Sequence, residues 1–130
     1  AISVNPNASV VAKVDGNVKP DDSLQVTTEM LQGNPDINVI FASTGPATYG
    51  ALQALQSSNK TGVALYGFCA SEVPLADQYK ACVAQEPEVY GGAVIEQIKG
   101  FLGGQTPAPE ILKSLKVFTT GQTPAPGEVG

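Results

Sequence analysis

The strongest constraint on the fold is the regular alternation of short apolar, β-branched runs with segments of helical periodicity. The runs predict strands at residues 9–14, 37–42, 63–68, 81–84 and 115–118. The periodic segments predict helices at residues 20–33, 45–58 and 88–102, and a short helix at 74–79. This order is typical of a parallel sheet with right-handed crossovers. Because the strand runs are continuously apolar, we expect an α/β fold: an open, mostly parallel twisted sheet with helices on both faces.

The chain has the length of one domain, and we interpret residues 1–120 as a single α/β lobe. One hexapeptide, GQTPAP, occurs at residues 104–109 and again at 121–126. Both copies are rich in Gly and Pro, which favours extended loops over repeat architecture or a binding role. Residues 121–130 are therefore predicted to form a Gly/Pro-rich C-terminal tail.

Composition excludes several functions. The sequence has no His and no Arg, so Ser-His-Asp catalysis, His-ligated zinc and bidentate guanidinium contacts are ruled out. A net charge of −5 argues against binding to nucleic acid or to an anionic membrane surface. The carboxylates are scattered, and there is no Gly-rich phosphate loop. We expect a protein that is not an enzyme, with no metal and no cofactor.

Open parallel sheets bind ligands at the carboxyl ends of their strands. The residues that follow the predicted strands are Ser43, Thr44 and Gly45, then Cys69, Ala70 and Ser71, and finally Gln85. Each has a structural alternative. Thr44 is well placed to cap the helix that begins at Gly45, and Gln85 to satisfy the backbone at its strand end.

Two cysteines, Cys69 and Cys82, are the only thiols. Their spacing is not that of a C-x-x-C motif, and two thiols alone do not make a structural zinc site. The residues leave two alternatives open. One is a disulfide, which would indicate an oxidising compartment, and the other is a pair of buried thiols.

Residues 31–45, LQGNPDINVIFASTG, resemble the family of periplasmic sugar-binding proteins typified by the ribose-binding protein. The family has a helix ending in a turn before Pro-Asp, a strand like residues 37–42, and polar residues at the strand end. The segments LYGFC at 65–69 and AQEP at 84–87 resemble two further strand ends of the family, in the same order and at similar intervals. The resemblance covers roughly residues 10–102.

The resemblance implies the solute-binding component of an ABC-type carbohydrate importer, which closes two lobes over a small sugar or sugar-like ligand. It implies a periplasmic or extracellular location, membrane-associated in a Gram-positive organism, and a membrane permease as partner. The chain looks like the second lobe only, with residues 1–4 as the tail of that lobe's first helix. The alternative is the sugar-sensing domain of a lactose-repressor-type regulator, which has the same fold. An unrelated receiver domain is disfavoured because Asp15 is its only acid at a strand end.

The resemblance also assigns ligand contacts. Thr44 stands where the family has Asn, Cys69 stands where it has Asp, and Gln85 is kept. Ser43 lies beside Thr44, and Phe68 either stacks on a sugar face or belongs to the core. A thiol accepts hydroxyl hydrogen bonds poorly, so ribose itself is in doubt. The extracytoplasmic setting and the expected closeness of the two strands favour a Cys69–Cys82 disulfide.

The predicted helix at 88–102 poses a difficulty. In the family, a segment corresponding to residues 86–110 crosses to the first lobe, which we expect to be missing from this chain. The helix carries apolar side chains at positions 90, 94, 98 and 101, and an uncovered stripe favours association. We expect the first lobe, or another copy of the chain, to cover this helix, or the helix to fold back on the sheet.

Overall fold

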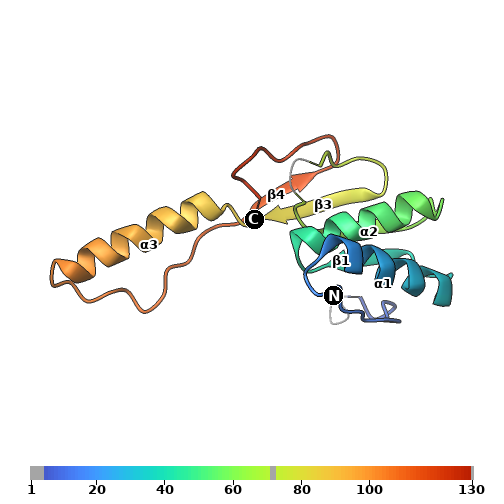
Figure 1. The fold of residues 1–130 in the computed structure, drawn as a ribbon, viewed down its shortest axis with the longest axis horizontal. Helices are drawn as coiled ribbons and strands as arrows, with labels where there is room; N and C mark the ends of the chain where they lie inside the picture. Colours follow the sequence, from blue (N-terminus) through green and yellow to red (C-terminus); the bar gives the residue numbers. More distant parts are fainter. Residues whose placement is uncertain (1–4, 71–72, 130) are drawn as a thin grey trace.

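The computed structural model of the chain describes residues 5–70 and 73–129 (Figure 1). Along the chain the elements are α1 (Pro20–Gly33), β1 (Val39–Ala42), α2 (Gly45–Ser57), β2 (Ala64–Phe68), β3 (Tyr79–Ala84), α3 (Pro87–Leu102) and β4 (Lys116–Thr119). The predicted α/β class is confirmed. Residues 1–4, expected to end an earlier helix, and the candidate Ser71 lie outside the described residues.

The four strands form one sheet in the order β1-β2-β3-β4. The first three strands are parallel, and β4 runs antiparallel to β3. Short β-branched and aromatic runs explain these strands, since such side chains fit a pleated surface. The mostly parallel sheet agrees with the sequence prediction.

One face of the sheet is covered by α2, and α1 packs in turn on α2 (Figure 1). The helices approach closely at Gly50, where a Cβ atom would lie 2.4 Å from the carbonyl oxygen of Pro20. The buried strand residues on this covered face alternate along the chain and share one register: Ile40, Ala42, Leu65, Cys82, Ala84 and Phe118. Together with Leu31, Leu52 and Leu55 they belong to the core.

The opposite face of the sheet carries no helix among the described residues, although the sequence predicts helices on both faces. Its side chains come from the alternate positions of all four strands and are nevertheless mostly apolar, with Thr119 as a polar exception. The most exposed are Val39, Phe41, Tyr66 and Val117, and Phe68 and Val83 are half-buried. We call these six residues the open sheet face.

The predicted strand at residues 9–14 is wrong. The segment carries no strand hydrogen bonding in the described structure, and Val10, Val11 and Val14 are at least half exposed. β-Branched residues favour a strand only where a neighbouring strand accepts them, because β-propensity mostly reflects packing.

The predicted helix at residues 74–79 is also wrong. Leu75 instead exchanges backbone hydrogen bonds with a distant segment, donating to Gln122 and accepting from Gly121. Asp77 then adopts a left-handed conformation, with φ of 49°, and β3 begins at Tyr79. Tyr49 in α2 is 41% exposed.

Helix α3 projects away from the sheet, and the chain returns beside it through residues 103–115 (Figure 1). No residue of α3 is buried. The expectation that this helix folds back on the sheet is therefore wrong. Only Gln85 and Glu86 separate β3 from α3, Glu86 is left-handed with φ of 49°, and Pro87 opens the helix, so the connection directs α3 outward. Within the described residues, no helix combines the length and apolarity needed to cross a bilayer.

Residues 121–129, predicted to be a tail, pack against the end of the sheet. Ala125, Pro126, Gly127 and Glu128 form a turn in which the Glu128 amide donates to the Ala125 carbonyl at 3.1 Å. Gly127 has φ of 85°, which a glycine adopts without steric cost. Pro124 is fully buried, so this segment belongs to the folded body.

Candidate functional site

The carboxyl ends of β1, β2 and β3 meet at one edge of the sheet. The registers place Ala42 beside Gly67 and Phe68 beside Val83. The residues that follow each strand therefore lie at the same edge, as the sequence predicts for Thr44, Cys69 and Gln85. Parallel neighbouring strands produce this result directly, because they all run in one direction.

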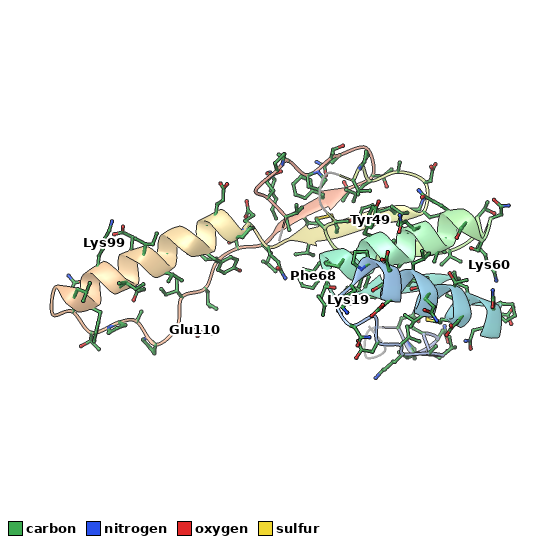
Figure 2. All side chains as sticks on the ribbon, in the orientation of Figure 1. Lys19, Tyr49, Lys60, Phe68, Lys99 and Glu110 are labelled. Atoms are coloured by element: carbon green, nitrogen blue, oxygen red, sulfur yellow. A yellow bond between two sulfur atoms is a disulfide. The ribbon has the colours of Figure 1, made fainter. Side chains whose placement is uncertain are left out.

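An open hollow of about 480 Å³ lies at this edge, beside the base of α3. It is lined by Phe68, Gln85, Pro87, Tyr90 and Leu115. Figure 2 shows Phe68 at the end of the sheet body that faces α3. Two residues predicted as ligand contacts, Phe68 and Gln85, are thus brought together with side chains of α3 and of the segment that returns from it.

The hollow combines a hydrogen-bonding amide with aromatic rings. Gln85 is exposed and offers an amide oxygen that accepts and an amide nitrogen that donates two hydrogen bonds. Phe68 and Tyr90 supply aromatic faces, which offer apolar packing surface to a ligand. None of the five lining residues is an Asp, Glu or Lys, so the hollow suits a neutral solute.

Thr44 caps α2, as the structural alternative predicts. Its hydroxyl oxygen accepts a hydrogen bond from the Ala47 amide at 3.3 Å, and its carbonyl accepts from the Thr48 amide at 2.9 Å. Neither Thr44 nor its exposed neighbour Ser43 lines the hollow. Ligand contacts by these two residues stay predictions, since a capping hydroxyl still has a hydrogen to donate.

Cys69 and Cys82 form a disulfide with a Cα–Cα distance of 4.8 Å, which settles the two alternatives for the cysteines. Both side chains are almost completely buried, so Cys69 offers little surface to a solute. The disulfide joins the end of β2 to the middle of β3, two strands that flank the hollow. Its evident role is to hold these strand ends in place, and direct ligand contact by Cys69 stays a prediction.

Thr48 is a residue of the site edge that sequence reasoning missed. It is completely buried in α2, and its hydroxyl lies 2.7 Å from the Phe68 carbonyl oxygen and 3.0 Å from that of Thr44. Gly67 permits this approach, because a Cβ atom there would lie 2.6 Å from the Thr48 hydroxyl oxygen. The available signal was a threonine four residues after the capping Thr44, on the inner face of an apolar helix.

Tyr79 supports the same edge from β3. Its ring is fully buried, and its hydroxyl oxygen accepts a hydrogen bond from the Ala70 amide at 3.2 Å, directly after Cys69. Burial raises the pKa of Tyr79, and the hydrogen bond from Ala70 partly offsets this effect. The phenol is therefore neutral at physiological pH and acts as a fixed acceptor.

The charged groups of the described structure lie outside the hollow. Lys116 forms an ion pair with Glu128. The hydrogen bonds that the Glu128 carboxyl accepts from the Lys116 ammonium and from the Ala125 amide lower its pKa. Among residues 5–70 and 73–129, no cluster of three or more acidic or cysteine side chains is placed to hold a metal ion. The edge is thus suited to binding through neutral hydrogen bonds and aromatic contact.

Comparison with known proteins shows the family and the fold of the chain. The family model for the periplasmic binding protein domain matches residues 1–106. The ribose import binding protein RbsB of Bacillus subtilis (strain 168) is 34% identical over 100 residues, which cover 74% of this chain and 32% of that protein. The ABC transporter periplasmic-binding protein YphF of Escherichia coli (strain K12) is 28% identical over 114 residues, which cover 83% of this chain and 35% of the length of YphF. The chain spans about a third of the length of these curated relatives.

Solved structures share the fold. A periplasmic solute-binding protein of an ABC transporter from Actinobacillus succinogenes 130z, with bound D-allose, superposes with a TM-score of 0.79 at 24% identity. That match covers 88% of this chain and 43% of the other. A solute-binding protein from Agrobacterium vitis, bound with α-D-tagatopyranose, gives a TM-score of 0.82 at 16% identity and covers 91% and 41% of the two chains.

Proposed function

We propose a sugar-binding role for this chain, which belongs to the family of periplasmic binding protein domains. The family consists of non-enzymatic solute-binding proteins. The chain serves as the second lobe of the solute-binding component of an ABC-type carbohydrate importer. A small neutral sugar or sugar-like ligand binds in the cleft between this lobe and an opposite lobe.

The observation that carries this proposal is the hollow at the carboxyl edge of β2 and β3. It unites the amide of Gln85 with the aromatic rings of Phe68 and Tyr90, without a charged group. The hollow is open, so a sugar bound there keeps one side exposed to water. A second lobe closing over that side would exclude water and strengthen each polar contact.

The path of the chain supports the assignment to the second lobe. Two segments leave and re-enter the sheet body side by side, one at Gln85 before α3 and one at Leu115 before β4 (Figure 1). Between them α3 stands clear of the sheet with its apolar side chains exposed. In the two-lobed protein this helix packs on the opposite lobe, and the paired segments act as the hinge.

The disulfide bears on the choice between an importer and a regulator. Cytosolic proteins keep their thiols reduced, whereas exported proteins retain disulfides. The Cys69–Cys82 bond therefore favours a periplasmic or extracellular receptor, membrane-associated if the organism is Gram-positive, over a lactose-repressor-type sensor. Its partner in transport is then the membrane permease.

The test is a titration of the 130-residue chain with a panel of pentoses and hexoses, followed by the backbone amide shifts in NMR spectra. We expect saturable shifts at Phe68 and Gln85, together with smaller ones at Thr44. Gln85→Ala removes these shifts, and Gln56→Ala, which changes an exposed glutamine of α2 away from the hollow, leaves them unchanged. Saturable shifts confined to other parts of the chain, or equal behaviour of the two variants, would refute the proposal.

A further inference from the structure

We propose that Glu128 is a positioning residue of the hollow, because it connects the two chain segments that border the hollow on either side of α3. This inference rests on the sugar-binding role proposed above and deepens it, since it names a residue outside the hollow that fixes the arrangement of the lining residues. The two segments are residues 85–87, which lead into α3, and residues 115–116, which return from it. We call them the leaving segment and the returning segment.

The backbone of Glu128 holds the leaving segment. The Glu86 amide donates a hydrogen bond to the Glu128 carbonyl oxygen at 3.1 Å. Glu86 lies between Gln85 and Pro87, two of the residues that line the hollow. Its φ of 49° is in the left-handed region, which a residue with a side chain rarely occupies unless surrounding contacts favour it. The bond to Glu128 is such a contact, so Glu128 helps to set the point at which α3 begins.

Hydrogen bonds continue from Glu86 into the first turn of α3. The Glu86 carbonyl oxygen accepts from the Val89 amide at 3.0 Å and from the Tyr90 amide at 3.4 Å. Tyr90 is a third residue that lines the hollow. A series of backbone hydrogen bonds thus runs from Glu128 through Glu86 to Tyr90. A shift of Glu86 would therefore move Gln85 and Tyr90 together, relative to the edge of the sheet.

The side chain of Glu128 holds the returning segment. Its Oε1 atom pairs with the Lys116 ammonium, and its Oε2 atom accepts from the Ala125 amide at 2.7 Å. Lys116 directly follows Leu115, a fourth residue that lines the hollow. Both bonds lower the pKa of the Glu128 carboxyl, so the acceptor is ionised at neutral pH, and charge-assisted hydrogen bonds are stronger than neutral ones. One residue thus contacts both segments that border the hollow.

Glu128 can hold these segments because its own part of the chain is fixed to the sheet body. Residues 121–129, at the red end of the chain, return to the base of α3 (Figure 1). Pro124 and Val129, on either side of the turn at residues 125–128, are buried. The Gln122 carbonyl oxygen accepts from the Leu75 amide at 2.9 Å. None of these contacts uses the exposed side chains of α3, so they are compatible with an opposite lobe that packs on this helix.

The first experiment measures hydrogen exchange of the Glu86 amide by NMR in the 130-residue chain. Glu128→Ala removes both carboxylate contacts and keeps the backbone carbonyl that the Glu86 amide binds. Because the carboxylate fixes that carbonyl, we expect exchange of the Glu86 amide to accelerate about threefold or more. Lys116→Met changes only the returning segment, and we expect it to accelerate exchange in the leaving segment as well. A purely local role of the Lys116 side chain would not produce this effect.

The matched control is an exposed ion pair that connects no separate segments. Lys99 and Glu96 pair at 2.9 Å within α3, one turn apart on the same helix. Glu96→Ala breaks this pair with the same change of side chain as Glu128→Ala. We expect it to leave exchange of the Glu86 amide within about 1.5-fold of the wild-type rate, since exposed pairs of this kind contribute little.

The second experiment is a sugar titration of the same variants, followed at the Gln85 amide. We expect Glu128→Ala and Lys116→Met each to raise the dissociation constant about threefold or more, and Glu96→Ala to leave it within about twofold. The two changes combined in one chain should add little to either alone, because both break the same pair. A loss of stability that leaves the folded chain unaltered does not change this constant, so the titration separates positioning from a merely structural role.

Two results would overturn the proposal. Exchange of the Glu86 amide that neither Glu128→Ala nor Lys116→Met accelerates would show that Glu128 does not connect the segments. Faster exchange with an unaltered dissociation constant would show that this connection does not position the hollow. The sugar-binding role survives both results, since the wild-type chain still binds. A wild-type chain without saturable shifts refutes the sugar-binding role itself and, with it, a ligand-positioning role of Glu128, whatever the exchange rates.

Discussion

The hydroxyl of Thr48 in α2 donates to the carbonyl oxygen of Phe68, 2.7 Å away at the end of β2. The Thr48 hydroxyl oxygen also lies 3.0 Å from the carbonyl oxygen of Thr44, the residue that caps α2. One buried side chain thus connects the ends of two strands at the edge where we place the sugar. The position of Phe68 in the hollow depends on this contact.

Replacing this hydroxyl by a methyl group tests the contact. Thr48→Val keeps the shape of the side chain and leaves the Phe68 carbonyl without this donor, so we expect unfolding to require about 1–2 kcal/mol less. Urea denaturation followed by circular dichroism measures the change. Thr28→Val is the control, because Thr28 bonds only to Leu24 in its own helix, and we expect a loss below about 0.5 kcal/mol. Equal losses in the two variants would contradict this role of Thr48.

Gly67 is predicted to tolerate no side chain. A Cβ atom there would lie 2.5 Å from the Ala42 carbonyl oxygen and 2.6 Å from the Thr48 hydroxyl, so a strand or the helix would have to shift. We expect Gly67→Ala to cost about 1–3 kcal/mol of stability. Gly62→Ala, where no atom lies within 4 Å of the new methyl group, serves as the control and is expected to be near neutral. Calorimetric melting of both variants measures the two changes in stability.

The disulfide is predicted to stabilise the chain and to be fully formed in the purified protein. It spans 13 residues, which corresponds to about 3 kcal/mol in the chain-entropy model. We expect the double variant Cys69→Ala, Cys82→Ala to lose about this amount in urea denaturation. A thiol titration in denaturant without reductant is expected to find no thiol, and the detection of two would show that the bond is not formed.

The buried phenol of Tyr79 predicts a specific loss of stability at alkaline pH. Its raised pKa means that the folded chain keeps the proton after the unfolded chain releases it, near pH ~10. The stabilisation is complete below that pH and is lost as the pH rises through the higher folded-state pKa. Phenolate absorbance should show a transition above the ordinary pH range of a phenol. Tyr79→Phe removes the late transition, and Tyr49→Phe leaves it in place; a late transition that survives Tyr79→Phe would contradict the assignment.

Much of this fold could be predicted because its signals are local. Helices α1, α2 and α3 begin close to the predicted residues, each with a proline in its first turn, and the parallel strands follow from their continuous apolar runs. The common edge of Thr44, Cys69 and Gln85 then follows from strand direction alone. The errors concern segments whose structure depends on distant partners. Leu75 bonds to Gln122, and no strand in the described structure pairs with residues 9–14.

The candidate site was predictable to a smaller extent. Gln85 and Phe68 were found through strand ends, but Tyr90 and Leu115 join them only because α3 and its return segment meet at the hollow. Thr48 was missed because its partner, the Phe68 carbonyl, is 20 residues away in sequence. The chain departs from the resemblance at Cys69, where the family has Asp and where the sulfur here is held in a buried disulfide.

The central claim is that this chain supplies one side of a sugar cleft and needs an opposite lobe to hold the ligand firmly. The most direct measurement is the dissociation constant of the best sugar of the panel, determined by calorimetry for the chain alone and after joining it to the first lobe of the Bacillus subtilis ribose import binding protein. We predict millimolar or weaker binding by the chain alone and at least a hundredfold gain in the two-lobed protein, which Gln85→Ala abolishes. Micromolar binding by the isolated chain, or a gain that Gln85→Ala leaves intact, would contradict the account.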